Sequence, residues 1–188
     1  MLVASIYDNA FFQQFARRLK ASAKFFGIDC ELFKRTQSSG PRSKARFRSE
    51  FILTRLTELR HPDLLLVDPD AVFTQRPAIL LDERDFDLAV YYDQKTLAVS
   101  GPIFVRNNPR IRRWVQEWHL LSNALPERSE YEALSTLLSQ PKVSLSVRRL
   151  PVTYAWVERV DRERHPSAQP VITHFQADSI STRVRLTV

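Results

Sequence analysis

Four consecutive apolar residues, Leu64 to Val67, are the feature that most constrains the fold of this chain. They lie between residues typical of turns, and the run ends abruptly at Asp68-Pro69-Asp70. A short continuous apolar run is typical of a strand that is buried on both faces, as in parallel sheets covered by helices. The sequence therefore predicts an α/β protein with this strand in its core.

Other segments of the chain show either the alternating or continuous apolar pattern of a strand or the spacing of three and four residues that is typical of a helix. Strands are predicted at 2–7, 29–33, 87–92, 102–105 and 143–147, and helices at 12–26, 44–59, 111–121 and 131–138. Gly27 and Pro62 are expected to end the first two helices, and Ser43 is a good N-cap for the second. Alternating strands and helices favour one α/β sheet with helices on both sides, and residues 1–188 are interpreted as a single domain.

Composition excludes several kinds of site and segment. The three glycines, Gly27, Gly40 and Gly101, form neither a G-x-G-x-x-G turn nor a Walker A loop. A single cysteine, Cys30, excludes an internal disulfide and a cysteine-based zinc site. Charged residues interrupt every apolar run, so no membrane span is predicted. The first eight residues do not resemble a secretory leader, and a cytoplasmic protein is expected.

The formal net charge is +7, mostly from arginine, and the basic residues form several clusters along the chain. Arginine suits phosphate because its planar guanidinium donates hydrogen bonds in pairs. A polyanionic partner such as nucleic acid is one interpretation of this charge. An ordinary solvated surface is the other.

Asp68 and Asp70 lie where an open α/β sheet binds its ligands, just beyond the carboxyl end of a buried strand. Their oxygens are hard ligands suited to Mg²⁺ or Mn²⁺, which proteins commonly hold with one or two carboxylates and the phosphates of a substrate. Such an ion could replace a glycine-rich phosphate loop. The simpler alternative is that Asp-Pro-Asp only forms a turn.

The segment from Leu64 to Pro77 resembles the D-x-D segment of nucleotide-diphospho-sugar transferases with the GT-A fold. Further similarities follow in the order found in that family. They include Lys44 on the preceding helix, 100–108, Trp114 and Trp118, 130–134, 150–154 and 171–174. The resemblance implies a GT-A-like, Rossmann-type mixed sheet flanked by helices. It also implies transfer of a hexose or pentose from a nucleotide diphosphate sugar, with a UDP-sugar as the default donor.

The same resemblance assigns roles to particular residues. Asp68, Asp70 and His174 would be ligands of Mn²⁺ or Mg²⁺, although His174 could instead be an ordinary histidine at the end of a strand. The donor would bind near Tyr7, Lys44, Arg48, Asp68, Ser100 and Gly101. The last two resemble a turn of small residues that lets the donor sugar approach the backbone closely.

Glu130 and Asp70 are the candidate catalytic residues. Glu130 matches an acidic position near the acceptor, where a carboxylate could orient or deprotonate the attacking hydroxyl. Relatives often have Asp-Gln where this chain has Glu130-Tyr131, so Glu127, Glu132 or a solvent-facing Glu130 remain alternatives.

Three further hypotheses concern the partner and the chemistry. The acceptor could be a hydroxylated base in DNA or another polyanion. Asp63 and the triplet Asp93-Gln94-Lys95 formally match a metal-dependent nuclease, and the basic residues between Lys34 and Arg48 would suit a nucleic-acid-binding domain without catalysis.

Overall fold

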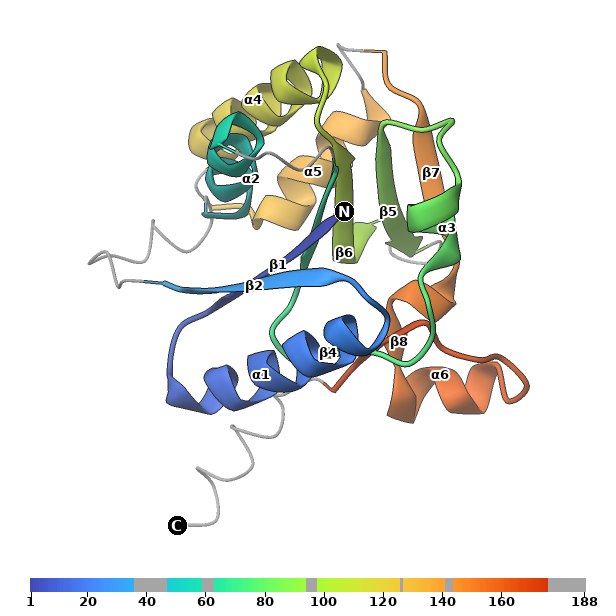
Figure 1. Cartoon of the computed structure of the whole chain (residues 1–188). Helices are drawn as coiled ribbons and strands as arrows, with labels where there is room; N and C mark the ends of the chain where they lie inside the picture. Colours follow the sequence, from blue (N-terminus) through green and yellow to red (C-terminus); the bar gives the residue numbers. More distant parts are fainter. Residues whose placement is uncertain (36–46, 59–62, 94–97, 126, 141–143, 176–188) are drawn as a thin grey trace.

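Six strands form the main sheet of the computed structural model, which describes residues 1–35, 47–58, 63–93, 98–125, 127–140 and 144–175 (Figure 1). The strand order is β2-β1-β3-β6-β5-β7. The bounds are β1 Leu2–Tyr7, β2 Asp29–Lys34, β3 Asp63–Val67, β5 Leu88–Asp93, β6 Ala98–Arg106 and β7 Val147–Leu150. Only β6 runs antiparallel to its neighbours, and the other pairs are parallel. The expected mixed α/β sheet is confirmed.

The directions of the strands decide which residues share an edge of the sheet. β1, β2 and β3 are parallel, so their carboxyl ends meet at one edge. β6 enters the sheet at this edge, because Ile103 pairs with Leu66 and Gly101 precedes it by two residues. The Asp68-Pro69-Asp70 turn and the beginning of β6 are therefore neighbours.

Helices cover both faces of the sheet, as the apolar run in β3 predicts. Leu64 and Leu66 face a core that includes residues of α2 (Phe47–Glu58), α4 (Pro109–Ala124) and α5 (Glu130–Ser139). Leu65 and Val67 face the opposite core, built with α1 (Ala10–Phe25) and α3 (Ala78–Asp82). Figure 1 shows α2, α4 and α5 gathered on one side and α1 on the other.

Local capping fixes the ends of the longest helices. Asn9 and Asn108 accept hydrogen bonds from the backbone N–H three residues later and so begin α1 and α4. Ser129 and Glu132 form a reciprocal capping box at the start of α5. Gly27 follows α1 with a φ of +70°, which confirms it as the expected stop.

A second, three-stranded sheet was not predicted. It has the order β4-β9-β8, with β4 Ala71–Phe73, β9 Ile172–His174 and β8 Trp156–Val157. The turn Val152–Tyr154 and α6 (Glu158–Arg164) accompany it. These strands have two or three residues each, too few for an alternating pattern to be recognised.

One predicted boundary is wrong and several are approximate. β7 begins at Val147, where the predicted strand at 143–147 ends, because Val147 is the first residue to pair with β5. β6 has nine residues instead of four. Residues 44–46 and 59 of the second predicted helix lie outside the described part of the chain, as do its predicted N-cap Ser43 and its predicted stop Pro62. None of the described helices is both long and apolar enough to cross a membrane.

Candidate active site

A pocket lies at the edge where β1, β2 and β3 end. Its lining comes from the ends of these strands and from the beginning of α2: Ile6, Asp8, Arg35, Phe47, Arg48, Leu66, Val67 and Asp68. Carboxyl ends of parallel strands form the usual ligand edge of an open α/β sheet, because loops and helix starts converge there. The acidic turn thus forms part of a pocket and not merely of a surface bend.

Arg48 forms an ion pair with the first acid of the acidic turn. Its guanidinium donates a 2.8 Å hydrogen bond to Asp68 Oδ1 and lies over the ring of Tyr131, 4.9 Å from the ring centre. Burial alone would lower the pKa of Arg48, but the nearby Tyr131 hydroxyl and Asp68 carboxylate raise it above its ordinary value. About a third of each charged side chain remains exposed. The pair is thus accessible to a ligand.

Glu130 anchors the beginning of α2. Its carboxylate accepts hydrogen bonds from the backbone N–H of Arg48 at 2.9 Å and of Ser49 at 3.0 Å, and from the Ser49 hydroxyl at 3.1 Å. A carboxylate also interacts favourably with the N-terminus of a helix. Burial raises the pKa of Glu130 despite these donors. Both oxygens are therefore engaged within the protein, and the side chain is only 3% exposed.

Gly101 lies beside His174. With a φ of +69° it has a backbone conformation that favours glycine, and a Cβ built there would lie 3.2 Å from Ala155 Cβ and 3.7 Å from His174 Nε2. The carbonyl of Gly101 accepts a 3.0 Å hydrogen bond from the Tyr131 hydroxyl. Tyr131 thereby connects Gly101, which lies within β6 and not in the expected turn, with Arg48.

The small sheet brings His174 next to the acidic turn. β9 pairs with β4, so that Ala71 lies opposite His174, and Phe175 N donates to Asp70 O at 3.3 Å. His174 is buried, and its Nε2 has no hydrogen-bond partner among the described residues. A buried polar atom without a partner is costly, so this nitrogen is suited to a ligand.

The donor set suits a hard divalent ion in part. Carboxylate oxygens and an imidazole nitrogen are acceptable ligands of Mn²⁺, and the unpartnered His174 Nε2 points to one coordination position. Within the described residues, however, no three His, Cys, Asp or Glu side chains are close enough to hold a metal ion by themselves. Other ligands, such as substrate phosphates, would have to complete the sphere.

The other residues predicted to bind the nucleotide-sugar donor differ in where they lie relative to the pocket. The hydroxyl of Tyr7 accepts a 3.2 Å hydrogen bond from Gln13 of α1, and Tyr7 is not among the residues that line the pocket, unlike its neighbours Ile6 and Asp8. Ser100 pairs with Tyr91 through the backbone next to Gly101. Lys44 lies outside the described residues.

Three pocket residues were missed by the sequence interpretation. Asp8 follows β1, Arg35 follows β2, and their side chains approach each other to 3.9 Å. Phe47 is the first residue of α2, and Arg35 lies over its ring. The signal that could have found Asp8 is the one that identified Asp68, namely a charged residue directly after a predicted strand. Arg35 lies two residues beyond the predicted end at Phe33 and directly follows only the observed β2.

Comparison with known proteins decides the family. The sequence profile described as "Nucleotide-diphospho-sugar transferase" matches residues 9–183. The chain belongs to the nucleotide-diphospho-sugar transferase family. It is therefore a glycosyltransferase, an enzyme that takes a sugar from a nucleotide-diphospho-sugar.

Solved structures share the fold of the transferase at low sequence identity. A glycosyltransferase involved in glycosylation of the major capsid of PBCV-1 superposes with a TM-score of 0.68 and 11% identity, over 93% of this chain and 94% of the other. GlyE of Streptococcus pneumoniae TIGR4 superposes with a TM-score of 0.60 and 13% identity, over 93% of this chain and 54% of the other. The galactosyltransferase LgtC, solved with donor and acceptor sugar analogues, superposes with a TM-score of 0.54 and 13% identity, over 94% of this chain and 87% of the other. These similarities establish the GT-A fold. No curated protein sequence matches the chain.

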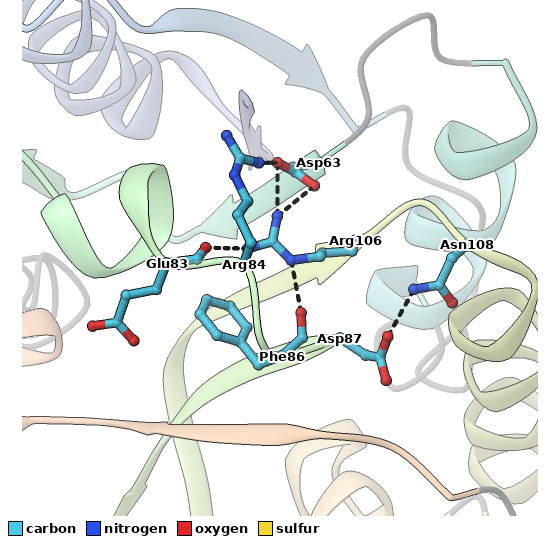
Figure 2. A network of polar contacts seen from close by, with 7 residues as sticks. All are labelled: Asp63, Glu83, Arg84, Phe86, Asp87, Arg106 and Asn108. Carbon is cyan, nitrogen blue, oxygen red and sulfur yellow. Dashed lines mark hydrogen bonds and ion pairs between the residues drawn. The ribbon is translucent and has the colours of Figure 1, made fainter.

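The nuclease interpretation of the sequence fails on geometry as well as on family. Asp63 begins β3 and Asp93 ends β5, and these strands run in the same direction because each is antiparallel to β6. The two residues thus lie at opposite edges of the sheet. Asp63 pairs with Arg84 and Arg106, each at 3.1 Å, in a polar network of the transferase away from the pocket (Figure 2).

The arginines at the start of α4 lie at that same distant edge. β6 ends opposite Asp63, and α4 follows it, so Arg110, Arg112 and Arg113 are far along the sheet from the acidic turn. Arg110 is paired with Asp87 at 2.9 Å. Asn108, the N-cap of α4, also donates to Asp87, at 2.8 Å (Figure 2). Arg110 of the transferase thereby holds the start of α4 near β5, and none of the three arginines lines the pocket.

Proposed function

We propose that the transferase is metal-dependent, binds a nucleotide diphosphate sugar at the edge formed by β1, β3 and β6, and transfers the hexose or pentose to a hydroxyl group of an acceptor. The donor is proposed to be a UDP-sugar by family resemblance. The observation that carries the metal assignment is the buried His174 Nε2, which lacks a partner among the described residues beside Gly101 and the Asp68-Pro69-Asp70 turn.

Asp68, Asp70 and His174 are the proposed ligands of Mn²⁺ or Mg²⁺. When bound, the ion would stabilise the negative charge that develops on the leaving diphosphate. Asp68 is paired with Arg48, so binding of the ion and the diphosphate would have to rearrange this pair. Arg48 would then be available to donate hydrogen bonds to phosphate oxygens.

In this proposal, the residues around Gly101 let the donor sugar approach the backbone of β6 closely. Gly101 has no side chain and adopts a left-handed backbone conformation, which lets the donor sugar come near the strand. Tyr131 holds the Gly101 carbonyl and supports Arg48 from the other side. The Tyr131 pKa is raised, mainly by burial, so the hydroxyl keeps its proton and remains a donor.

Glu130 has a positioning role in this proposal instead of the role of base first expected for it. Its two oxygens accept three hydrogen bonds from Arg48 and Ser49. A base needs a free oxygen within reach of the acceptor hydroxyl. Holding the first turn of α2 is the function that these contacts support, because that turn carries Arg48 to the pocket.

The proposed acceptor follows from the charge of the chain. A hydroxylated base in DNA, or another polyanion, is supported by the net charge of +7. The arginines of α4 do not add support, since they lie at the other edge of the sheet. Transfer to DNA would have to become weaker with rising salt, because phosphate contacts release counterions. Transfer to DNA that is insensitive to salt, or no transfer at all, would remove DNA from consideration.

A thermal-shift panel tests donor and metal together. Nucleotide diphosphates and their sugars are added with and without Mn²⁺, and a ligand of the folded state raises the Tm. We expect one nucleotide to raise the Tm only with metal, and Asp70→Ala to abolish the shift. Asp29→Ala, which removes an exposed acid at the start of β2, is the matched control and should keep it. A nucleotide shift that is the same without metal and in Asp70→Ala would refute the metal site.

A further inference from the structure

The outer face of α1 has an unusual distribution of charge. The helix carries four cations, Arg17, Arg18, Lys20 and Lys24, and no acidic residue. All four are exposed. Arg17, Lys20 and Lys24 are spaced by three and four residues, so they form one stripe along the helix. The opposite face of the helix packs on the protein through Ala16, Leu19 and Ala23.

These four cations have no ion-pair partner among the described residues, which sets them apart from most other basic side chains of the fold. Arg55 pairs with Glu31 at 2.6 Å, Arg76 with Asp82 at 2.6 Å, and Arg162 with Glu158 at 2.9 Å. Arg48, Arg84, Arg106, Arg110 and Arg148 are paired in the same way. Positive charge on α1 is therefore left for an external anion.

Two exposed phenylalanines lie at the ends of this face. Phe25 is 83% exposed and Phe11 is 37% exposed, and they belong to a stripe beside the cations that also contains Gln14, Arg18 and Ala21. The five positions follow spacings of three and four residues and share one side of the helix. Leaving a large aromatic side chain in water is unfavourable, so this stripe is suited to an apolar or interfacial environment.

We propose that the outer face of α1 docks on a membrane surface rich in anionic lipids, with the cations at the phosphate level and Phe11 and Phe25 in the headgroup region. A helix face that carries a basic stripe beside large apolar residues is suited to lie in the plane of such an interface. Duplex nucleic acid would satisfy the cations but would leave the phenylalanines, one near each end of a 16-residue helix, without an apolar environment, whereas a single strand, whose bases stack on aromatic rings, is an alternative that the experiment tests.

The position of α1 gives this surface a relation to the pocket. α1 begins directly after β1, so the Phe11 end is next to Asp8, which lines the pocket. Figure 1 shows α1 on the outside of the fold, with its long axis along one side of the molecule. A protein docked by this helix would hold its donor pocket close to the membrane surface.

Co-sedimentation with vesicles tests the proposal on the full chain. Vesicles of pure phosphatidylcholine are compared with vesicles that also contain phosphatidylglycerol, at low and at high salt. We expect binding only to the anionic vesicles and weakening by salt. The triple variant Arg17→Gln, Lys20→Gln, Lys24→Gln should lose on the order of a hundredfold in affinity, because each cation near an anionic surface contributes several-fold.

Matched controls separate the helix from the overall charge. The triple variant Arg113→Gln, Arg159→Gln, Arg164→Gln removes the same charge from exposed positions elsewhere and should bind nearly as well as the parent protein. Phe25→Ala should weaken binding roughly tenfold. Leu120→Ala, at a residue that is 59% exposed on α4, should not. Unchanged far-UV circular dichroism verifies that each variant folds.

Several results would overturn the proposal. Absence of binding to anionic vesicles would do so, as would equal losses in the two triple variants, which would mean that only net charge matters. The same holds for binding that is indifferent to Phe25. Tight binding of a single-stranded oligonucleotide that needs the α1 cations, without any binding to vesicles, would assign the surface to nucleic acid instead.

Discussion

The guanidinium of Arg48 lies 2.8 Å from a carboxylate oxygen of Asp68, which joins the first turn of α2 to the end of β3 inside the pocket. The more exposed of the two arginines named in the pocket lining is thus neutralised by one of the two acids of the D-x-D segment. A divalent ion bound to Asp68 would replace Arg48 as the partner of that carboxylate. A diphosphate bound to Arg48 would replace Asp68 as the partner of the guanidinium. We therefore expect metal and diphosphate to bind cooperatively.

The first prediction concerns Arg48→Gln. It should weaken binding of a nucleotide diphosphate in the presence of Mn²⁺ by on the order of tenfold or more, because a charge-assisted hydrogen bond contributes about 1.5–3 kcal/mol. Binding of the nucleoside without phosphates should change little. Titration calorimetry measures both. Arg55→Gln, on the other end of α2, serves as the control, and equal losses in the two variants would contradict the assignment.

Glu130→Gln distinguishes the two roles considered for this residue. If Glu130 holds the beginning of α2, the amide presents a donor to backbone N–H groups, and the free energy of unfolding should fall by about 1–3 kcal/mol. Chemical denaturation measures this loss. A base would behave differently: turnover would collapse while the free energy of unfolding stayed at the parental value, and that outcome would restore the catalytic assignment.

The pH dependence of stability gives an independent check on Glu130. Its folded-state pKa is raised, mainly by burial, so the folded protein binds this proton more tightly than the unfolded chain. The resulting stability is present below the ordinary pKa of a glutamate and is lost as the pH rises through the folded-state pKa. The difference in unfolding free energy between the parent and Glu130→Gln should therefore be larger in acid than at neutral pH. A difference that grows with pH would contradict the raised pKa.

Gly101→Ala tests the close approach at the beginning of β6. The φ of +69° is unfavourable for alanine, and its Cβ would lie 3.2 Å from Ala155 Cβ. We expect a loss of about 1–2 kcal/mol in stability together with weaker binding of the donor. Gly27→Ala is the control, since it has a similar φ of +70° but open space around it. Gly27→Ala should lose stability through the same unfavourable backbone conformation but should bind the donor as well as the parent protein does.

Cys30 should be inert in the folded protein. Burial raises the pKa of its thiol to about 11, so very little thiolate exists at pH 8. Alkylation by iodoacetamide at pH 8, followed by mass spectrometry, should be slow in buffer and rapid in denaturant. Fast labelling of the native protein would show that the region around β2 opens readily.

Much of the fold could be predicted from the sequence because its strongest patterns are local. Leu64 to Val67 identified the buried strand, and helical spacing located α1, α4 and α5 to within a few residues. The small sheet could not be predicted, since its strands are too short to have a period. The same contrast applies to the residues of the site. Asp68 was recognisable because it directly follows a strand, whereas His174 was recognisable only from family resemblance.

The roles of Glu130 and Tyr131 illustrate what remained out of reach. Whether Glu130 faces an acceptor or a helix end depends on α5 and α2 meeting in space, and nothing near residue 130 in the sequence indicates that contact. Tyr131, on α5, likewise gains its position from Gly101 on β6, 30 residues earlier in the chain. Contacts between distant segments decide these roles.

The pairing of β9 with β4 also governs when the site can exist. Asp70 and His174 come together only after β9 has been synthesised, roughly a hundred residues after β4. While the chain is still growing on the ribosome, β4 has no partner strand from β9, and the imidazole is missing from its place beside the Asp68-Pro69-Asp70 turn. The protein would therefore acquire the proposed metal site only once β9 has been synthesised, and a chain truncated before β9 would keep the strands of the main sheet but lack His174.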